Sequence, residues 1–375
     1  SFVELPDAGY TPRAYDPRAG YGAMRYDDYS ARLGEPLTKR FLRRHRLKKA
    51  DPMAAVSDAV EPIVYYLDRG TPEPVRSALL DGARWWNQAF EAAGYRNAFE
   101  VRMMPEGADN LDVRYNVIQW VHRSTRGWSY GNSVIDPRTG EIIKGHVTLG
   151  SLRVRQDYLL AEGRLSPYLD GNEHPTELSD MALARIRQLS AHEVGHTLGL
   201  GHNYYASTQG RISVMDYPHP MMKIRSDGSL NWSNAYDTDI GEWDKVAVEY
   251  AYRDFPKGTN EDRELEKILS SAWNRGLWFI TEKDERPLGS AHPQAHLWDN
   301  GENAGDQLNH LMKVRVIALS NFGEANIREG APYSSLEEVL VPLYLHHRYQ
   351  LAATSIVVAG LEFRSAVRGD GQPEV

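Results

Sequence analysis

The chain of 375 residues contains no cysteine, which excludes disulfides, thiol catalysis, cysteine-ligated zinc and iron–sulfur clusters. It also lacks an excess of basic residues. Its 43 Lys and Arg residues face 51 Asp and Glu residues, a formal net charge of −8, so we expect no nucleic-acid partner. Apolar runs such as 352–361 are too short to reach the ~20 residues that span a bilayer.

The first sixty residues are rich in Pro, Gly, Asp and Tyr and show little periodicity. We expect residues 1–60 to form an extension that wraps the folded domain after it. A basic cluster at 39–49 is interpreted as a strand or helix whose charges face water or pair with acidic neighbours; an anion-binding patch is the alternative.

Two features of the composition bear on location. The chain starts in polar sequence without a charged-then-apolar leader, so we expect a fragment or a processed form whose signal peptide is gone. The lack of cysteine suits an exported bacterial protein. The expected location is therefore secreted or periplasmic.

The hydrophobic pattern from residue 61 onward predicts an α+β fold with a twisted mixed sheet. A helix at 72–93, with Thr71 as its N-cap and Gly94 as its stop, would back the sheet. A long helix runs from about 177 to about 198, another covers 239–252, and the chain beyond 255 is mainly helical around an irregular stretch at 284–306. The predicted strands are 63–67, 99–104, 116–123, 130–136 and 141–149.

The long helix ends in a run of polar residues on its apolar face. His192 and His196 are four residues apart, so both imidazoles lie on one side and can direct a nitrogen at one ion at ~2.0–2.1 Å. Gly199 has no Cβ and permits a sharp turn, after which His202 can complete a set of three imidazoles. The plain alternative is a helix with two solvated histidines and a glycine C-cap.

Three protein ligands leave a fourth position for water, which is typical of a catalytic zinc site. Glu193, next to the first ligand, is placed to touch that water without binding the ion itself. The sequence therefore predicts one catalytic Zn²⁺ held by His192, His196 and His202, with Glu193 as general base.

The run 192–202 has the pattern His-Glu-x-x-His-x-x-Gly-x-x-His and resembles the metzincin clan of zinc endopeptidases. The resemblance implies a methionine turn at 213–217, with Met215 as an apolar floor below the imidazoles. It also implies that Tyr217, as in the astacin-like and serralysin-like branches, contacts the metal or the developing oxyanion. Ordinary core packing is the alternative for both residues.

The chain departs from the familiar branches at Asn203, where astacins usually carry Glu, and the lack of cysteine excludes a cysteine switch. We therefore assign no classical subfamily. Together with residues 86–94 and the His-His-Arg at 346–348, the zinc motif is similar to a bacterial group of zinc-dependent metalloproteases of a domain-of-unknown-function type.

The resemblance also implies an architecture. An upper catalytic subdomain, 61–203, would hold the sheet, the backing helix and the active-site helix above a cleft. Its edge strand at 130–135, with Tyr130, would pair with an extended substrate. A small irregular lower subdomain, 204–255, would carry the methionine turn, and its Pro218 would line the pocket for the residue after the scissile bond. A mainly helical region, 256–375, would follow.

The remaining histidines are read as structural. His219 as an additional zinc ligand is disfavoured, and His346 and His347 are adjacent on a predicted helix and so point apart. A second metal, calcium through acids or zinc through histidines, is conceivable in the stretch 284–306, but such loops are more often plain turns. Its candidate ligands are His292, His296, Asp299 and Asp306.

The predicted function is a zinc-dependent endopeptidase that hydrolyses peptide bonds of a peptide or protein substrate. A zinc-bearing protein that holds peptide without cutting it is one alternative, although Glu193 speaks against it. A zinc hydrolase acting on a non-peptide amide is another, because the water chemistry is the same. The substrate, the cleavage preference and the oligomeric state stay open.

Overall fold

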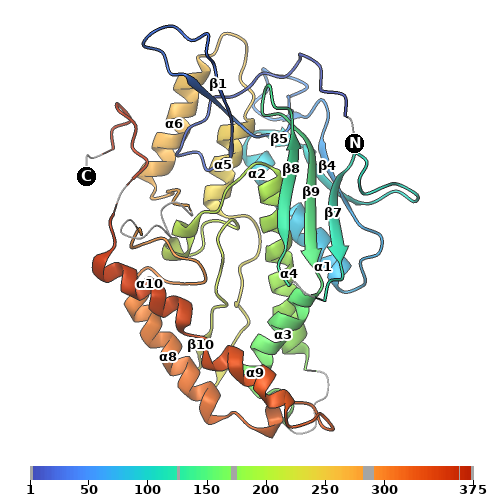
Figure 1. The fold of residues 1–375 in the computed structure, drawn as a ribbon, viewed down its shortest axis with the longest axis vertical. Helices are drawn as coiled ribbons and strands as arrows, with labels where there is room; N and C mark the ends of the chain where they lie inside the picture. Colours follow the sequence, from blue (N-terminus) through green and yellow to red (C-terminus); the bar gives the residue numbers. More distant parts are fainter. Residues whose placement is uncertain (1–2, 125–126, 170–174, 282–290, 363, 373–375) are drawn as a thin grey trace.

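A five-stranded mixed sheet forms the centre of the computed structural model, which describes residues 3–124, 127–169, 175–281, 291–362 and 364–372 (Figure 1). Neighbouring strands run parallel except for the last, which is antiparallel and forms the edge. The predicted strands are confirmed, with small shifts at their ends. In spatial order they are β6 (Phe99–Met103), β4 (Ile63–Leu67), β7 (Asn116–Val121), β9 (Ile142–Gly150) and β8 (Tyr130–Ile135).

Three helices cover one face of this sheet. The long helix α4 (Thr176–Thr197) packs against β8 and β9, and α1 (Val75–Arg84) and α2 (Trp86–Ala92) pack against β6. The single helix predicted at 72–93 is wrong in its start and its continuity. The Thr71 hydroxyl donates to the Asp68 carbonyl and does not cap a helix, so α1 begins only after the second proline, Pro74.

A helix that the sequence analysis missed follows the sheet. α3 (Leu152–Leu165) comes directly after β9 and packs against both α4 and the C-terminal region. Beyond α4 the chain is irregular, with short elements before the next helix, α5, which packs on α2. The short elements are η2 (Tyr204–Gln209), β10 (Lys223–Ile224) and β11 (Leu230–Asn231), and α5 spans Glu242–Tyr252.

The C-terminal region is mainly helical, as predicted. In Figure 1 the helices α8, α9 and α10 lie together at the lower left, and α9 packs against α3. Of the predicted irregular stretch, residues 284–290 lie outside the described residues, and 291–303 are irregular. The helices are α6 (Glu261–Asn274), α8 (Ala304–Ser320), α9 (Ser335–Tyr344) and α10 (Arg348–Ala359), with a short turn η3 (Glu324–Asn326).

The N-terminal residues run along the other elements and form short strands only. Part of the basic cluster pairs with neighbours and part of it faces water: Arg46 pairs with Asp7 and Glu141, the Lys49 ammonium donates to two main-chain carbonyls, and Arg40, Arg43 and Lys48 are exposed. This agrees with charges that pair with neighbours. The strands are β1 (Ala23–Asp27), β2 (Thr38–Leu42), β3 (Ser57–Asp58) and β5 (Tyr95–Arg96).

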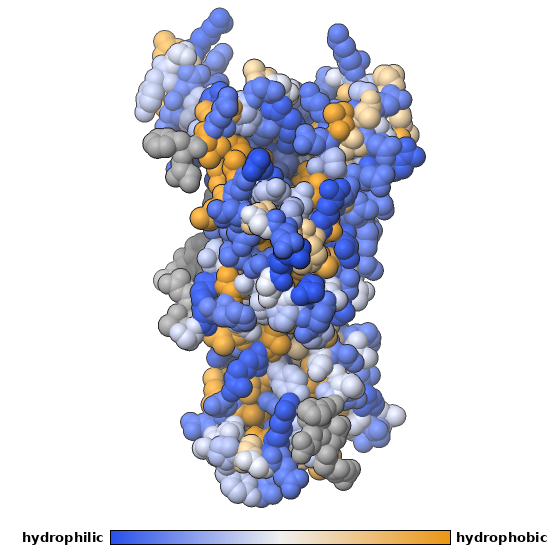
Figure 2. Space-filling view, turned by 90° about the vertical axis from the view of Figure 1, so that its right-hand side faces the viewer, coloured by the Kyte–Doolittle hydropathy of each residue, from blue (hydrophilic) through white to orange (hydrophobic). Residues whose placement is uncertain are grey.

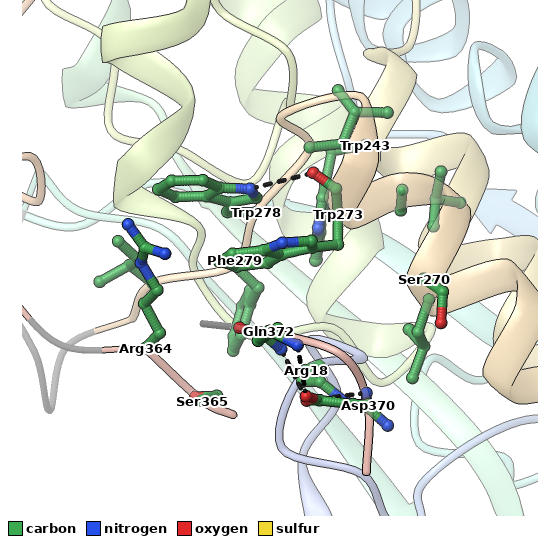
Figure 3. A pocket seen from close by; sticks show the side chains of 15 residues that line it. Arg18, Trp243, Ser270, Trp273, Trp278, Phe279, Arg364, Ser365, Asp370 and Gln372 are labelled. Carbon is green, nitrogen blue, oxygen red and sulfur yellow. Dashed lines mark hydrogen bonds and ion pairs between the residues drawn. The ribbon is translucent and has the colours of Figure 1, made fainter. Parts of the chain in front are cut away.

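Both ends of the chain meet at α6. Arg18 pairs with Asp16, with Glu266 of α6 and with Asp370 near the C-terminus, and Figure 3 shows Arg364 against the ring of Trp278. The cavity among these side chains measures only about 40 Å³, room for little more than water. This cluster therefore ties the termini together and offers no space for a substrate.

The side of the molecule seen in Figure 2 is mostly hydrophilic, with hydrophobic residues in patches between the polar ones. Among the described helices, none combines the length and the apolar character needed to cross a membrane. The division into four units at residues 60, 203 and 255 stays a prediction.

Candidate metal centre

Three histidine side chains meet at the C-terminal end of α4. His192 and His196 lie one turn apart on this helix, and His202 lies just beyond it. The Nε2 atom of His196 is 3.2 Å from Nε2 of His192 and 3.0 Å from Nε2 of His202. His192 is only 2% exposed, which rules out the alternative of solvated histidines.

The opposite ring nitrogens of these histidines face oxygen atoms. Nδ1 of His192 is 2.8 Å from the Val214 carbonyl, and Nδ1 of His196 is 2.9 Å from the Leu200 carbonyl. A carbonyl only accepts, so both rings carry their proton on Nδ1 and present an Nε2 lone pair at the centre of the group. Carbonyls that accept a hydrogen bond from the other ring nitrogen orient histidine ligands in metal sites.

The convergence of three Nε2 atoms fits a zinc ion. Burial and the neighbouring imidazoles lower the pKa of His192 well below its usual value, so the ring stays neutral. Three nitrogens at ~2.0–2.1 Å from one ion in tetrahedral directions would lie about 3.3–3.4 Å apart. The observed separations are close to this value, and within the described part of the chain no other group of three potential ligands lies within reach of a single ion.

Gly199 makes the turn that brings His202 back to the helix end. Its φ of +107° lies in the region that favours glycine, and a Cβ atom there would lie 2.0 Å from the Arg43 carbonyl oxygen. The N-terminal residues hold this turn in place, because the Gly22 amide donates to the Gly199 carbonyl. The role assigned to Gly199 from the sequence thus has a steric basis.

Glu193 belongs to α4 and lies next to the edge strand β8. It is 5% exposed, and burial raises the pKa of its carboxyl group to about 8, while Arg185 and a hydrogen bond from the Gly131 backbone lower it. A Cβ on Gly131 would lie 2.2 Å from the Glu193 carbonyl oxygen, so only glycine allows β8 to approach this closely. A dication beside the carboxyl would favour its ionised form, the form that a general base requires.

The predicted methionine turn lies directly below the helix end. Met215 is fully buried, and its thioether lies against Gly195 of α4. The Met215 carbonyl accepts a hydrogen bond from the amide of Asn203. The side chain of Asn203 also binds the C-terminal region, with Nδ2 donating to the Trp278 carbonyl and Oδ1 accepting from the Ile280 amide. Asn203 occupies the position where astacins carry Glu, and its side-chain amide both donates and accepts a hydrogen bond there.

Asp244 of α5 organises the same turn and was not recognised from the sequence. It is fully buried, and its carboxylate accepts hydrogen bonds from the Ser213 hydroxyl at 2.6 Å, the Val214 amide at 2.8 Å and the Gly241 amide at 2.9 Å. Val214 in turn supplies the carbonyl that orients His192. The acid thus links α5 to the first ligand.

We expect Asp244→Ala to destabilise the fold by about 2–4 kcal/mol, because it leaves two buried amides and a hydroxyl without their acceptor. Asp244→Asn, which keeps one carbonyl oxygen, should cost less. Urea denaturation of the three proteins measures both differences. A loss below about 0.5 kcal/mol for the alanine variant, within the usual range for surface changes, would show that the carboxylate does not hold the turn.

Tyr217 lies beside the histidines. Its ring centroid is 4.4 Å from that of His202 and 5.3 Å from that of His192. On its other side it stacks on Trp298 at 5.0 Å with an interplanar angle of 17°. Trp298 was not predicted as a residue of the site, because no sequence motif links it to the histidines, which lie far from it in the sequence.

The other predicted residues lie further out. Tyr130 is 40% exposed on β8, and the alternation of the strand places it on the face opposite to Gly131 and α4. Pro218 lines a cavity next to Tyr217. His219 packs against His346, and so does not join the three histidines. His292, His296, Asp299 and Asp306 do not assemble into a three-ligand group among the described residues.

Comparison with known proteins adds two matches to this geometry. Residues 174–375 match a family model described as Met-zincin, and residues 1–50 match one described as a domain of unknown function (DUF5117). The first match covers α4, the three histidines, the methionine turn and the C-terminal helices. Searches of the curated proteins and of the solved structures found no significant match.

Proposed function

The chain belongs to the Met-zincin family, and on this premise we propose that it is a zinc-dependent endopeptidase that cuts peptide bonds with a metal-activated water and Glu193 as general base. One observation carries the proposal: the Nε2 atoms of three imidazoles converge on one point, and a buried carboxyl group follows the first of them on the same helix. A structural zinc site would need no such acid.

Zinc, when bound by His192, His196 and His202, would lower the pKa of water and polarise the peptide carbonyl. Glu193 would accept a proton from the attacking water and deliver it to the leaving amine. No further strand of the described chain pairs with the outer edge of β8, so the backbone of an extended substrate can pair with this strand. Tyr130 remains a proposed substrate contact on this strand.

We expect Tyr217→Phe to lower kcat by about 10- to 100-fold with little change in zinc content, because the hydroxyl would donate to the developing oxyanion. Steady-state kinetics on a quenched fluorescent peptide measure the effect. Tyr205→Phe, a buried tyrosine of the next helical turn, serves as control and should keep wild-type kcat. Equal kcat in wild type and Tyr217→Phe would leave the ring with a packing role only.

The proposed function is tested by digesting casein and a quenched peptide library with the full chain, with and without a chelator. We expect cleavage that the chelator abolishes and that added zinc restores. Intact peptides in the presence of one bound zinc per chain would instead favour a protein that holds peptide, or a hydrolase of non-peptide amides.

A further inference from the structure

A cavity of about 380 Å³ lies next to the metal centre. Its walls come from five parts of the chain: α3, the segment after the methionine turn, Tyr236, Trp298, and the residues from the end of α9 to the start of α10. Pro218 and Trp298 line it, and Trp298 stacks on Tyr217, whose ring contacts two of the three histidines. A substrate residue just beyond the cleaved bond could therefore place its side chain here.

The charged side chains lining this cavity are all basic. Arg153, Arg164 and Arg348 contribute guanidinium groups, and no Asp or Glu of the described chain is part of the lining. The charge of Arg153 is already matched, since it pairs with Asp157 at 2.9 Å. Arg348 is exposed and donates to the Tyr349 hydroxyl. The guanidinium of Arg164 differs from both in its surroundings.

Arg164 is a buried cation without an acidic partner. It is 4% exposed and donates to the carbonyls of Leu160 and Pro342 and to Nδ1 of His346, and no carboxylate of the described residues pairs with it. Burial lowers its pKa to about 9, so the group is still charged at neutral pH. An unpaired buried charge is costly, and an anion in the adjoining cavity would offset this cost.

Three buried nitrogen atoms around the cavity also lack a hydrogen-bond partner within the described chain: Nε of Arg164, Nε2 of His346 and Nδ1 of His219. Because Arg164 donates to Nδ1 of His346, a neutral His346 carries its proton on Nε2. The wall of the cavity therefore contains two buried N–H groups, on Arg164 and His346, that have no acceptor within the described chain. Buried polar groups of this kind are normally satisfied, which points to a missing ligand.

We propose that this cavity binds the carboxylate side chain of a Glu or Asp that follows the scissile bond of the substrate, with Arg164 and His346 as its donors. The proposal rests on the proposed endopeptidase function and adds to it a preference for acidic residues. Discrimination of this kind is strong, because a neutral side chain would leave the buried donors unpaired.

The preference is measured by mass spectrometry of cleavage products from an amidated peptide library, in which only side chains supply carboxylates. We expect Glu and Asp to be enriched at least about tenfold after the cut, relative to Gln and Asn. Cleavage that depends on zinc but shows no such enrichment would overturn the cavity assignment and leave the proposed function standing. No cleavage of any peptide would count against the proposed function itself.

Variants test the assignment to the cavity. Arg164→Gln should reduce kcat/KM for a Glu peptide at least tenfold and leave that for the matched Gln peptide nearly unchanged. Arg155→Gln, an exposed arginine on the same helix outside this cavity, is the control and should keep the wild-type ratio. An unchanged Glu/Gln ratio in Arg164→Gln would contradict the proposal.

A second variant covers the case in which Arg164→Gln does not fold. His346→Phe removes one donor and retains a ring, and Arg348→Ala removes an exposed charge at the cavity. Both should lower the Glu/Gln ratio several-fold. Calorimetric binding of the two peptides to each variant gives a readout independent of turnover, and equal affinities for both peptides in the wild type would also overturn the assignment.

Discussion

Glu193→Gln is expected to reduce peptide cleavage by roughly 10³-fold while zinc content and unfolding behaviour stay as in the wild type. The amide has nearly the shape of the carboxyl group but cannot accept a proton from water. Its carbonyl oxygen can still accept the hydrogen bond that the Gly131 backbone gives to Glu193. The loss should therefore fall on kcat, and a peptide should still bind.

The measurement is single-turnover cleavage with metal content determined on the same sample. Glu177→Gln, at the opposite end of the same helix, is the matched control and should cleave at the wild-type rate. If Glu193→Gln retained more than about a tenth of wild-type activity with zinc bound, another group would have to take the proton.

His202→Ala is expected to weaken zinc binding more than about 100-fold, because loss of a group that only hydrogen-bonds to a zinc ligand already costs about 10- to 100-fold. It should abolish cleavage at ordinary zinc concentrations. The fold should survive, since the turn at Gly199 is held by the N-terminal residues and not by the imidazole. Competition with a zinc-binding dye measures the affinity.

The control for this variant is His122→Ala, which removes an exposed histidine that follows β7 directly and whose Nδ1 lies 2.9 Å from the Ser151 hydroxyl. It should bind zinc as the wild type does. A chain with His202→Ala that still held one zinc at wild-type affinity would contradict the ligand set and reassign the third position.

Local signals in the sequence were enough for the sheet. Strand 63–67 is rich in β-branched and aromatic residues and appears unchanged as β4, and the turn before Gly140 separates β8 from β9 as predicted. α3 was missed because its arginines and acidic residues interrupt the apolar stripe; its buried residues include Asp157 and Arg164. Polar residues that a tertiary site buries cannot be told from surface residues by periodicity alone.

The residues of the metal centre that lie close together in the sequence were predictable, and those from distant segments were not. The fixed spacing of the three histidines and Gly199 is a local pattern, and the structure brings these residues together. Three residues of the site and its cavity lie 42 to 144 residues beyond His202 in the sequence: Asp244, Trp298 and His346. Only the packing of the chain brings such residues near the histidines, so no spacing rule could have found them.

X-ray absorption spectroscopy at the zinc K-edge of the wild-type chain measures whether His192, His196 and His202 bind one zinc ion. We predict one zinc per chain with three imidazole nitrogens at ~2.0–2.1 Å and one oxygen ligand supplied by solvent. A spectrum with fewer than three imidazoles, or a chain that retains no zinc after purification in zinc-containing buffer, would contradict the account.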